Sequence, residues 1–380
     1  MDNIYIDHAA TTPLAARVNE VMYEYGKTIY GNPSSVHAFG RDARKYLDEA
    51  RMTVAHSLRA HESEVIFTSG GTEAINRALI GVALANKKFG NHLITSNQEH
   101  QATLHTMHYL EAIGFKVTYI ETDETGCVYI DHIKQAITDE TILVSIMMVN
   151  NETGVIQPIE EIGALCSERE IVFHTDAVQA FGPLPINVDQ LQVDVLSISA
   201  HKVNGPKGVG ALYVREGTHM QPLQYGGEQE RKRRAGTENV IGIVGFAEAV
   251  KDIEEHRVGH QSHIQACAET FLQALHTHGV NYTINGDRSI RVHGIINLSF
   301  PKTHVESMLM NLDIEGIAAS SGSACTAGTV EPSHVLQAMF GENSEQTTNS
   351  IRFSFGKENT LEEMEEAAKR LATIVQRIQA

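Results

Sequence analysis

Short apolar segments alternate with segments of helical periodicity along the first two thirds of this chain. The apolar segments lie at residues 64–69, 92–96, 116–121, 142–150, 171–176 and 193–199. Helical periodicity lies between them, at residues 72–88, 101–113, 131–137 and 159–170. Apolar segments of this length are typical of strands that are buried on both faces. The alternation therefore predicts an α/β fold, with a mostly parallel sheet covered by helices on both faces.

The pattern changes after about residue 240. A long helical stretch, residues 240–278, is followed by the apolar segments "IINLSF", "GIAAS" and "SIRFSFG" and by a final amphipathic segment. Thr360 precedes that final segment and Glu363 stands three positions later, which predicts a helix N-cap with a capping box. Because 380 residues with 42% hydrophobic content can bury more than one core, we expect a second, smaller α+β domain here.

The charge of the chain limits its partners. Acidic residues number 47 and basic residues 30, so the formal net charge is −17, which disfavours direct binding to nucleic acid or an anionic membrane. The amino terminus lacks the basic and apolar regions of a secretory signal, and no apolar run reaches the ~20 residues of a membrane-spanning helix. We expect a cytoplasmic protein.

One basic cluster, Arg231, Lys232, Arg233 and Arg234, departs from this acidic character. Four charges are weak evidence for nucleic-acid binding in a chain of this net charge. Because the cluster lies next to Thr237, we expect it at a dimer interface or near the entrance to a cofactor site. A solvated loop is the alternative.

The first strand end carries a phosphate-binding pattern. In "FTSGGTEAIN" an apolar segment breaks at Gly70 and Gly71, and a helix is expected to begin near Thr72. Unsatisfied amides at a helix N-terminus bind anions, and the threonine hydroxyl adds a donor. The stretch matches neither the P-loop nor the dinucleotide fingerprint, and "GPKGVG" at residues 205–210 predicts only a turn before a strand. A strand–turn–helix junction that binds nothing is the alternative.

Two later strands end in polar side chains. "IVFHTDAVQ" delivers Asp176 and Gln179, and "SISAHK" delivers Ser199, His201 and Lys202. Ligands of parallel sheets bind at the carboxyl ends of the strands, so these side chains are expected to lie beside the phosphate site. A lysine amine, an aspartate and phosphate donors are the parts of a pyridoxal phosphate (PLP) site. An ordinary ion pair is the alternative.

Ten motifs are spread over nearly the whole chain. They are "YIDHAATTP", "YGNPSSVHAFGR", "FTSGGTEA", "EHQA", "NNETG", "HTDAVQ", "SAHKVNGPKG", "RRAGTEN", "SSGSACT" and "IRFSFG". Together they resemble the cysteine desulfurases of the NifS/IscS class, which are fold-type-I PLP enzymes. The resemblance implies a large PLP-binding domain of residues 13–250 with a mostly parallel seven-stranded sheet. The small domain would comprise residues 1–12 and 251–380 and carry a catalytic loop at about 320–330.

The resemblance also implies roles for the residues at the strand ends. Lys202 would form a Schiff base with PLP, Asp176 would pair with the pyridinium nitrogen, and Gln179 would hydrogen-bond the phenolic oxygen. His100 would stack on the ring. The phosphate would be held by Gly71, Thr72, Ser199 and His201, together with Thr237 of the neighbouring subunit. That last role implies a homodimer with shared sites.

The alternation of residues in its own strand predicts which way the Arg352 side chain points. In "SIRFSFG" the apolar Ile351 and Phe353 alternate with polar residues, so the arginine is expected to point away from the apolar face. There it is free to bind an anion. The resemblance implies that this anion is the substrate α-carboxylate, held as a bidentate pair with help from Asn151. A surface arginine without a partner is the alternative.

The four cysteines have no spacing typical of a disulfide framework or a zinc site, and we expect no metal. Cys127, Cys166 and Cys267 are interpreted as small side chains without a role. Cys325 lies in "ASSGSACTAGT", a run of small residues that suits a mobile loop. The resemblance implies that its thiolate attacks the sulfur of L-cysteine, which leaves a persulfide and, after proton transfer by His100 or Lys202, L-alanine.

The sulfur acceptor is not specified by any motif. Some desulfurases have a longer tail that helps to dock an iron–sulfur scaffold, whereas this chain ends soon after its last expected helix. We therefore favour a tRNA 2-thiouridine synthase as acceptor over an iron–sulfur scaffold, and expect any RNA to be reached through that protein. Transamination, selenocysteine lysis and a non-catalytic thiol relay through Cys325 are the alternative functions.

Overall fold

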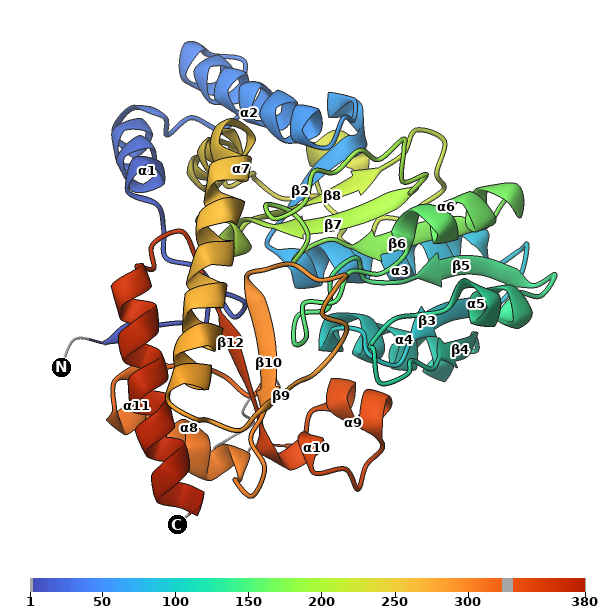
Figure 1. Ribbon diagram of the computed structural model, residues 1–380. Coiled ribbons are helices and arrows are strands. Elements are labelled where there is room, and N and C mark those ends of the chain that lie inside the picture. Colours follow the sequence, from blue (N-terminus) through green and yellow to red (C-terminus); the bar gives the residue numbers. More distant parts are fainter. Residues whose placement is uncertain (1–2, 323–330, 380) are drawn as a thin grey trace.

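A seven-stranded β-sheet forms the centre of the larger part of the molecule in the computed structural model, which describes residues 3–322 and 331–379 (Figure 1). In spatial order its strands are β2 (Val65–Thr68), β8 (Gly210–Val214), β7 (Val195–Ser199), β6 (Val172–Asp176), β5 (Thr141–Ser145), β3 (His92–Ser96) and β4 (Lys116–Ile120). All run parallel except β8, which is antiparallel to both of its neighbours. The predicted mostly parallel sheet is confirmed.

Helices cover both faces of this sheet, as predicted. On one face, α3 (Gly71–Asn86) and α4 (Gln101–Ala112) share an apolar core with the strands. The other face is covered by α2 (Ala38–Ser57), α5 (Ile130–Ala136), α6 (Ile159–Glu168) and the first part of α7 (Val240–Thr277). Short 3₁₀ turns lie at Glu62–Glu64, Ala200–Lys202 and Gln229–Lys232. The central strands β5 and β7 are buried along their whole length because apolar layers pack on each side of them.

A smaller part is built around a second sheet. Its antiparallel strands are, in order, β12 (Ser350–Ser354), β10 (Ile295–Ser299) and β9 (Thr283–Ile284). A separate parallel pair joins β1 (Ile4–Tyr5) to β11 (Ile317–Ala318). The helices of this part are α8 (Val305–Ile314), α9 (His334–Phe340), α10 (Gln346–Asn349) and α11 (Leu361–Gln379). The predicted capping box of α11 is confirmed, since Thr360 Oγ1 accepts from Glu363 N at 3.1 Å and Glu363 Oε2 accepts from Thr360 N at 3.1 Å.

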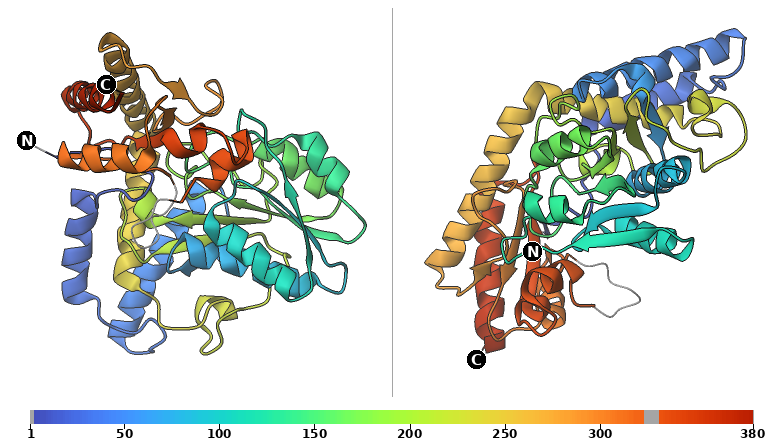
Figure 2. Two further views of the ribbon diagram at one scale, coloured as in Figure 1. Left: turned by 90° about the horizontal axis from the view of Figure 1, so that it is seen from below. Right: turned by 90° about the vertical axis from the view of Figure 1, so that its right-hand side faces the viewer.

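The long helix α7 connects the two parts (Figures 1 and 2). Its first turns pack against α1 (Ala16–Thr28) and α2, and its last turns share the core of the smaller part with α11. The helix therefore continues through residue 250, the boundary expected between the domains, and that division stays a prediction. Among the described residues, no helix combines the length and the apolar character needed to cross a bilayer.

Candidate active site

A cavity of about 460 Å³ lies at the carboxyl ends of the parallel strands. The predicted site residues that line it are Gly71, Thr72, His100, Asn151, Asp176, Gln179, Ser199, His201, Lys202 and Arg352. The structure thus brings together side chains that lie on or shortly after different strands of both sheets. Thr237 is exposed and is not part of this lining, and Cys325 lies outside the described residues.

Lys202 occupies the 3₁₀ turn directly after β7. Its Nζ donates hydrogen bonds to the carbonyl oxygens of Ala9 and Ala10, the latter at 2.9 Å. Burial, followed by the nearby positive charge of Arg352, lowers the pKa of Lys202 to about 8. A neutral amine is the form that attacks a carbonyl carbon, so this lysine is suited to Schiff-base formation near neutral pH.

Asp176 ends β6 and is almost completely buried. Its Oδ1 accepts a hydrogen bond from Val178 N at 2.9 Å. Burial raises the pKa of Asp176 to about 6, although Val178 N and the charge of Lys202 act in the opposite direction. The carboxylate therefore lacks full compensation for its burial, and a protonated pyridine nitrogen would supply it.

The phosphate pattern forms an open cradle. α3 begins at Gly71, after Gly70 with a φ of 150°, and both Gly71 and Thr72 line the cavity. A Cβ on Gly71 would lie 2.9 Å from Val178 Cγ2 and 3.7 Å from Ser199 Cβ, so the space depends on glycine. Ser199 Oγ is buried and has no hydrogen-bond partner among the described residues. An unused buried donor at a helix N-terminus fits a bound phosphate.

Arg352 is buried, and its strand neighbours Ile351 and Phe353 lie in the core, as the alternation predicts. Its Nη2 pairs with Asp7 Oδ1 at 2.8 Å, and its Nη1 donates to the Asn151 carbonyl oxygen at 2.9 Å. Its Nε has no partner among the described residues, nor has the buried Asn151 Oδ1. The arginine is thus fixed in position and keeps donor capacity for a carboxylate.

His100 is the N-cap of α4. Its Nδ1 accepts a hydrogen bond from Ala102 N at 3.1 Å, which assigns the ring proton of the neutral imidazole to Nε2. Burial, and then the positive charge of Lys202, lower the pKa of His100 to about 4. The ring is therefore neutral at pH 7, and it lines the same cavity as Lys202.

Both described flanks of the segment that holds Cys325 lie at this cavity. Ser320, Gly322 and His334 are among its lining residues. The buried Glu152 contacts both flanks, because its Oε2 accepts a hydrogen bond from Ser333 Oγ at 2.5 Å and lies 2.6 Å from the position of a Cβ on Gly322. The described chain therefore reaches the edge of the cavity on both sides of the segment that holds Cys325.

Several of these residues were not identified from the sequence. Asp7 stands in the motif "YIDHAATTP". The sequence could have indicated it only through the need of a buried Arg352 for an acidic partner. Glu152 stands in the motif "NNETG", but its partner Ser333 is distant in the sequence. His334 had no local signal, since its partner Glu99 is distant as well. His334 Nε2 donates to the carbonyl oxygen of Glu99 at 2.8 Å, which ties α9 to the start of α4.

The other cysteines and the basic cluster lie elsewhere. Burial raises the pKa of Cys127, Cys166 and Cys267, so their thiols stay protonated at neutral pH. The basic cluster is not one continuous patch. Arg231 and Lys232 are exposed, whereas Arg234 pairs with Glu73, in the first turn of α3, at 2.9 Å.

Comparison with known proteins assigns a family to this geometry. The family described as Aminotransferase class-V matches residues 4–366. The chain belongs to the class-V aminotransferase family. A protein of Bacillus subtilis (strain 168) named putative cysteine desulfurase IscS 1 is 53% identical to it over 378 residues, covering 100% of both chains.

Two solved structures share its fold. A NifS-like protein matches with a TM-score of 0.92 and 37% identity, covering 99% of this chain and 100% of the other. A structure described as SspA in complex with cysteine matches with a TM-score of 0.83 and 35% identity, covering 94% and 99%. The predicted resemblance to the NifS/IscS class is confirmed over the full chain. The chain is PLP-dependent, as enzymes of this family are, and the unused Ser199 hydroxyl and the uncompensated Asp176 fit that cofactor.

The lowered pKa of Lys202 predicts how PLP binding depends on pH. The rate of Schiff-base formation in cofactor-free protein should rise about tenfold per pH unit below pH 8 and level off above it, because only the neutral amine reacts. Stopped-flow absorbance after mixing with PLP measures this rate.

Two variants give opposite controls. Arg352→Met removes a charge that lowers the pKa of Lys202, so the midpoint of the curve of rate against pH should move to higher pH. Asp176→Asn removes a charge that raises this pKa, so the midpoint should move to lower pH. A rate that does not change between pH 6 and 9 would contradict the assignment.

Proposed function

We infer that this chain is a PLP-dependent cysteine desulfurase, which converts L-cysteine to L-alanine and holds the sulfur as a persulfide on Cys325. The observation that carries this proposal is the composition of the cavity. It joins a lysine of lowered pKa, a buried aspartate and a buried arginine, and both flanks of the Cys325 segment border it. Relatives named as cysteine desulfurases and a neighbour described in complex with cysteine support the same substrate.

The proposed cofactor contacts follow from the lining. Lys202 would join PLP covalently, Asp176 would hold its pyridinium nitrogen, and Gln179 would donate to its phenolic oxygen, with His100 against the ring. The phosphate would lie on the cradle formed by Gly71, Thr72, Ser199 and His201. When bound, PLP supplies an electron sink that weakens bonds at the substrate Cα.

Arg352 would bind the substrate carboxylate. Its contacts with Asp7 and the Asn151 carbonyl oxygen hold the guanidinium in one orientation, while its Nε remains available. The amide of Asn151 lies beside it and would add a donor to the same carboxylate. A substrate held by Arg352 would share one cavity with Lys202 and with the flanks of the Cys325 segment, as sulfur transfer requires.

The proposed reaction balances without an external oxidant. The thiolate of Cys325 attacks the sulfur of L-cysteine, a new S–S bond forms, and the C–S bond of the substrate breaks. Lys202 removes the Cα proton. Protons returned by Lys202, or by His100 after its neutral ring has accepted the proton released by a thiol, complete L-alanine. The sum is L-cysteine plus an enzyme thiol, giving L-alanine plus an enzyme persulfide.

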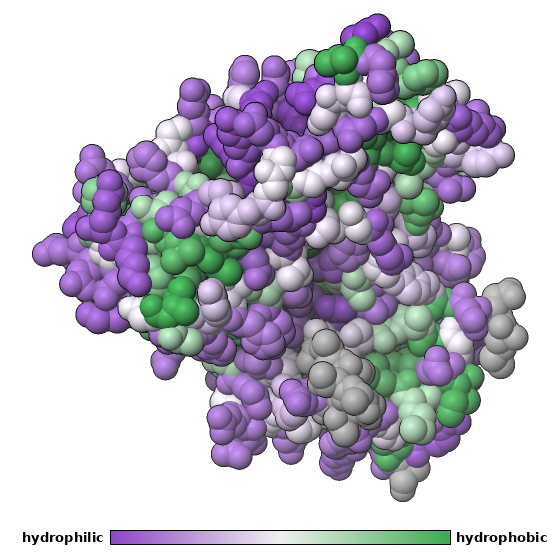
Figure 3. All heavy atoms as spheres, turned by 180° about the vertical axis from the view of Figure 1, so that it is seen from behind, coloured by the Kyte–Doolittle hydropathy of each residue, from purple (hydrophilic) through white to green (hydrophobic). Residues whose placement is uncertain are grey.

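We also propose a homodimer. Thr237 is exposed on its own chain, which agrees with a role at the phosphate of a second copy. Large apolar side chains are exposed in the segment before α2 and in the loop before Thr237, namely Tyr30, Val36 and Tyr225. A buried ion pair between Arg51 Nη2 and Glu230 Oε1, 2.6 Å long, joins α2 to the loop before Thr237. Figure 3 shows several patches of hydrophobic residues on one mostly hydrophilic face of the molecule.

The sulfur acceptor that we propose is a tRNA 2-thiouridine synthase, in the cytoplasm. An iron–sulfur scaffold is the second candidate. The net charge of −17 disfavours direct contact with tRNA, so the persulfide sulfur would first move to a protein cysteine.

Cys325 provides the direct test of the activity. Cys325→Ser should keep the yellow colour of bound PLP and lose L-alanine formation from L-cysteine, because no thiolate remains to take the sulfur. Cys127→Ser is the matched control and should form alanine at the wild-type rate. Full alanine production by Cys325→Ser would refute the assignment.

Mixed dimers test the shared site. A dimer of one Lys202→Ala chain and one Thr237→Ala chain contains one intact site only if Thr237 serves the partner subunit. We expect such a mixed dimer to keep about half of the wild-type activity, as one of its two sites is complete. Activity no higher than that of the Thr237→Ala homodimer would show that Thr237 acts within its own chain.

Transfer of labelled sulfur tests the acceptor. We expect ³⁵S from a persulfidated enzyme to move faster to a tRNA 2-thiouridine synthase than to an iron–sulfur scaffold at equal concentrations, measured on non-reducing gels. Faster labelling of the scaffold would reverse the proposed order of acceptors.

A further inference from the structure

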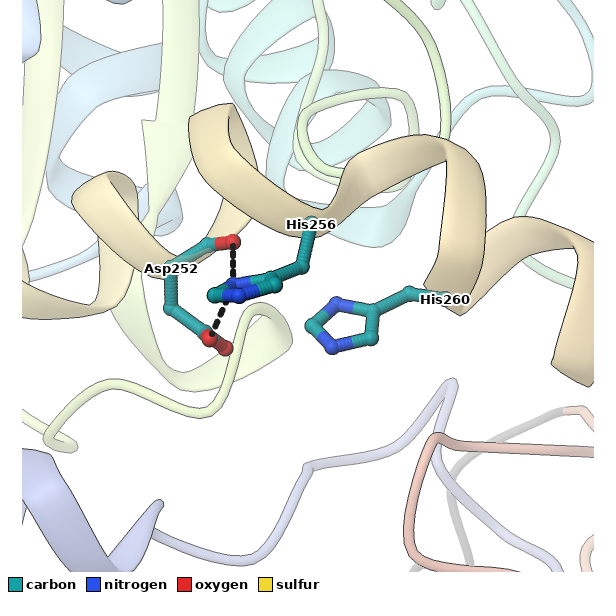
Figure 4. A group of neighbouring side chains, drawn as sticks. All are labelled: Asp252, His256 and His260. Atoms are coloured by element: carbon teal, nitrogen blue, oxygen red, sulfur yellow. Dashed lines mark hydrogen bonds and ion pairs between the residues drawn. The ribbon is translucent and has the colours of Figure 1, made fainter.

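One carboxylate and two imidazoles lie together on α7, outside the cavity described above (Figure 4). Asp252, His256 and His260 are spaced four residues apart, which places them on one face of the helix. One ligand atom from each side chain lies within 4.8 Å of the other two. Asp252 and His260 are half-buried and His256 is exposed, so the group is accessible from solvent.

The distances suit a small cation. His256 Nδ1 lies 3.1 Å from Asp252 Oδ1, and the rings of His256 and His260 have centroids 5.6 Å apart and an interplanar angle of 32°. In a tetrahedral zinc site with bonds of roughly 2.0–2.1 Å, neighbouring ligand atoms are about 3.3 Å apart. The separation of His256 and Asp252 is already close to this value, and the ligand atom of His260 lies within 4.8 Å of both.

A positive charge next to the group competes with a metal ion for Asp252. The ammonium group of Lys357 forms an ion pair with Asp252 Oδ2.

Space for the ion is present beside the helix. A cavity of about 100 Å³ is lined by Asp252, His260 and Lys357, though not by the exposed His256, and it extends to Lys202 and Gln179 of the site described above. Lys357 lies in the segment after β12, and its ammonium group pairs with Asp252 of α7. A metal ion bound to Asp252 would replace this contact.

We propose that Asp252, His256 and His260 bind a divalent metal ion of the zinc type, with water in the remaining position. Imidazole and carboxylate ligands favour Zn²⁺ or Co²⁺ over Mg²⁺, which prefers oxygen ligands only. The expectation of no metal rested only on the spacing of the cysteines. The pattern Asp-x₃-His-x₃-His within a helical stretch is the sequence signal for this group.

Calorimetric titration of the PLP-loaded protein with Zn²⁺ tests this site. All proteins carry Cys325→Ser, which removes a competing thiol, and L-cysteine is left out. We expect one Zn²⁺ per chain, and a Kd that rises at least about tenfold in His256→Gln and in His260→Gln, since each loses one of three ligands. Lys357→Met should lower the Kd, because it removes the cation that competes for Asp252.

Controls separate this site from unspecific binding. His276→Gln alters an exposed histidine near the end of the same helix and should leave the Kd unchanged. Mg²⁺ should give no comparable heat, and Co²⁺ should give visible absorption bands of a low-coordinate ion that both histidine variants lose. Bound PLP and circular dichroism report folding of each variant. Absence of Zn²⁺ binding, or an equal Kd in the wild type and in folded His256→Gln and His260→Gln, would overturn the proposal.

Discussion

The parallel pairing of the central strands is the constraint on which the rest of this structure depends. Because these strands point the same way, their carboxyl ends meet at one edge of the sheet. Gly71, His100 and Lys202 follow three of these strands, Asp176 ends a fourth, and all line one cavity at that edge. The antiparallel β8 leaves this edge intact, since it pairs between β2 and β7 without interrupting their common direction. The topology of the sheet thus brings these side chains together, and the chemistry of the site depends on it.

Burial then sets the protonation states at this edge. Removal from water lowers the pKa of Lys202 to about 8 and of His100 to about 4, and raises that of Asp176 to about 6. Each shift favours the neutral form, as desolvation does for acids and bases alike. The site consequently contains a reactive amine and an acid whose charge needs a cationic partner. A cofactor with an aldehyde, a basic ring nitrogen and a phosphate would bind the amine, the acid and the phosphate cradle at once. This explains why the three lie in one cavity.

Local patterns predicted much of the fold and of the site. The alternation of strands and helices, the residues at the strand ends and the phase of Arg352 in β12 are properties of short stretches, and the structure agrees with each of them. Contacts between distant residues could not be predicted from such stretches. Arg352 and Asp7 are 345 positions apart, and Glu152 and Ser333 are 181 apart, so neither pair leaves a local pattern. The strand order also depends on pairing between distant segments, and the helices α1 and α2 precede the first long apolar strand, so the alternation predicted neither.

The position of the covalent bond to PLP tests the central claim most directly. Reduction of the PLP-loaded protein with borohydride fixes the cofactor on the lysine that holds it, and peptide mass spectrometry then locates the label. The strand-end geometry predicts a single pyridoxyl group on Lys202, in the 3₁₀ turn that follows β7. A label on the nearby Lys207 or on any other lysine would contradict the site described here.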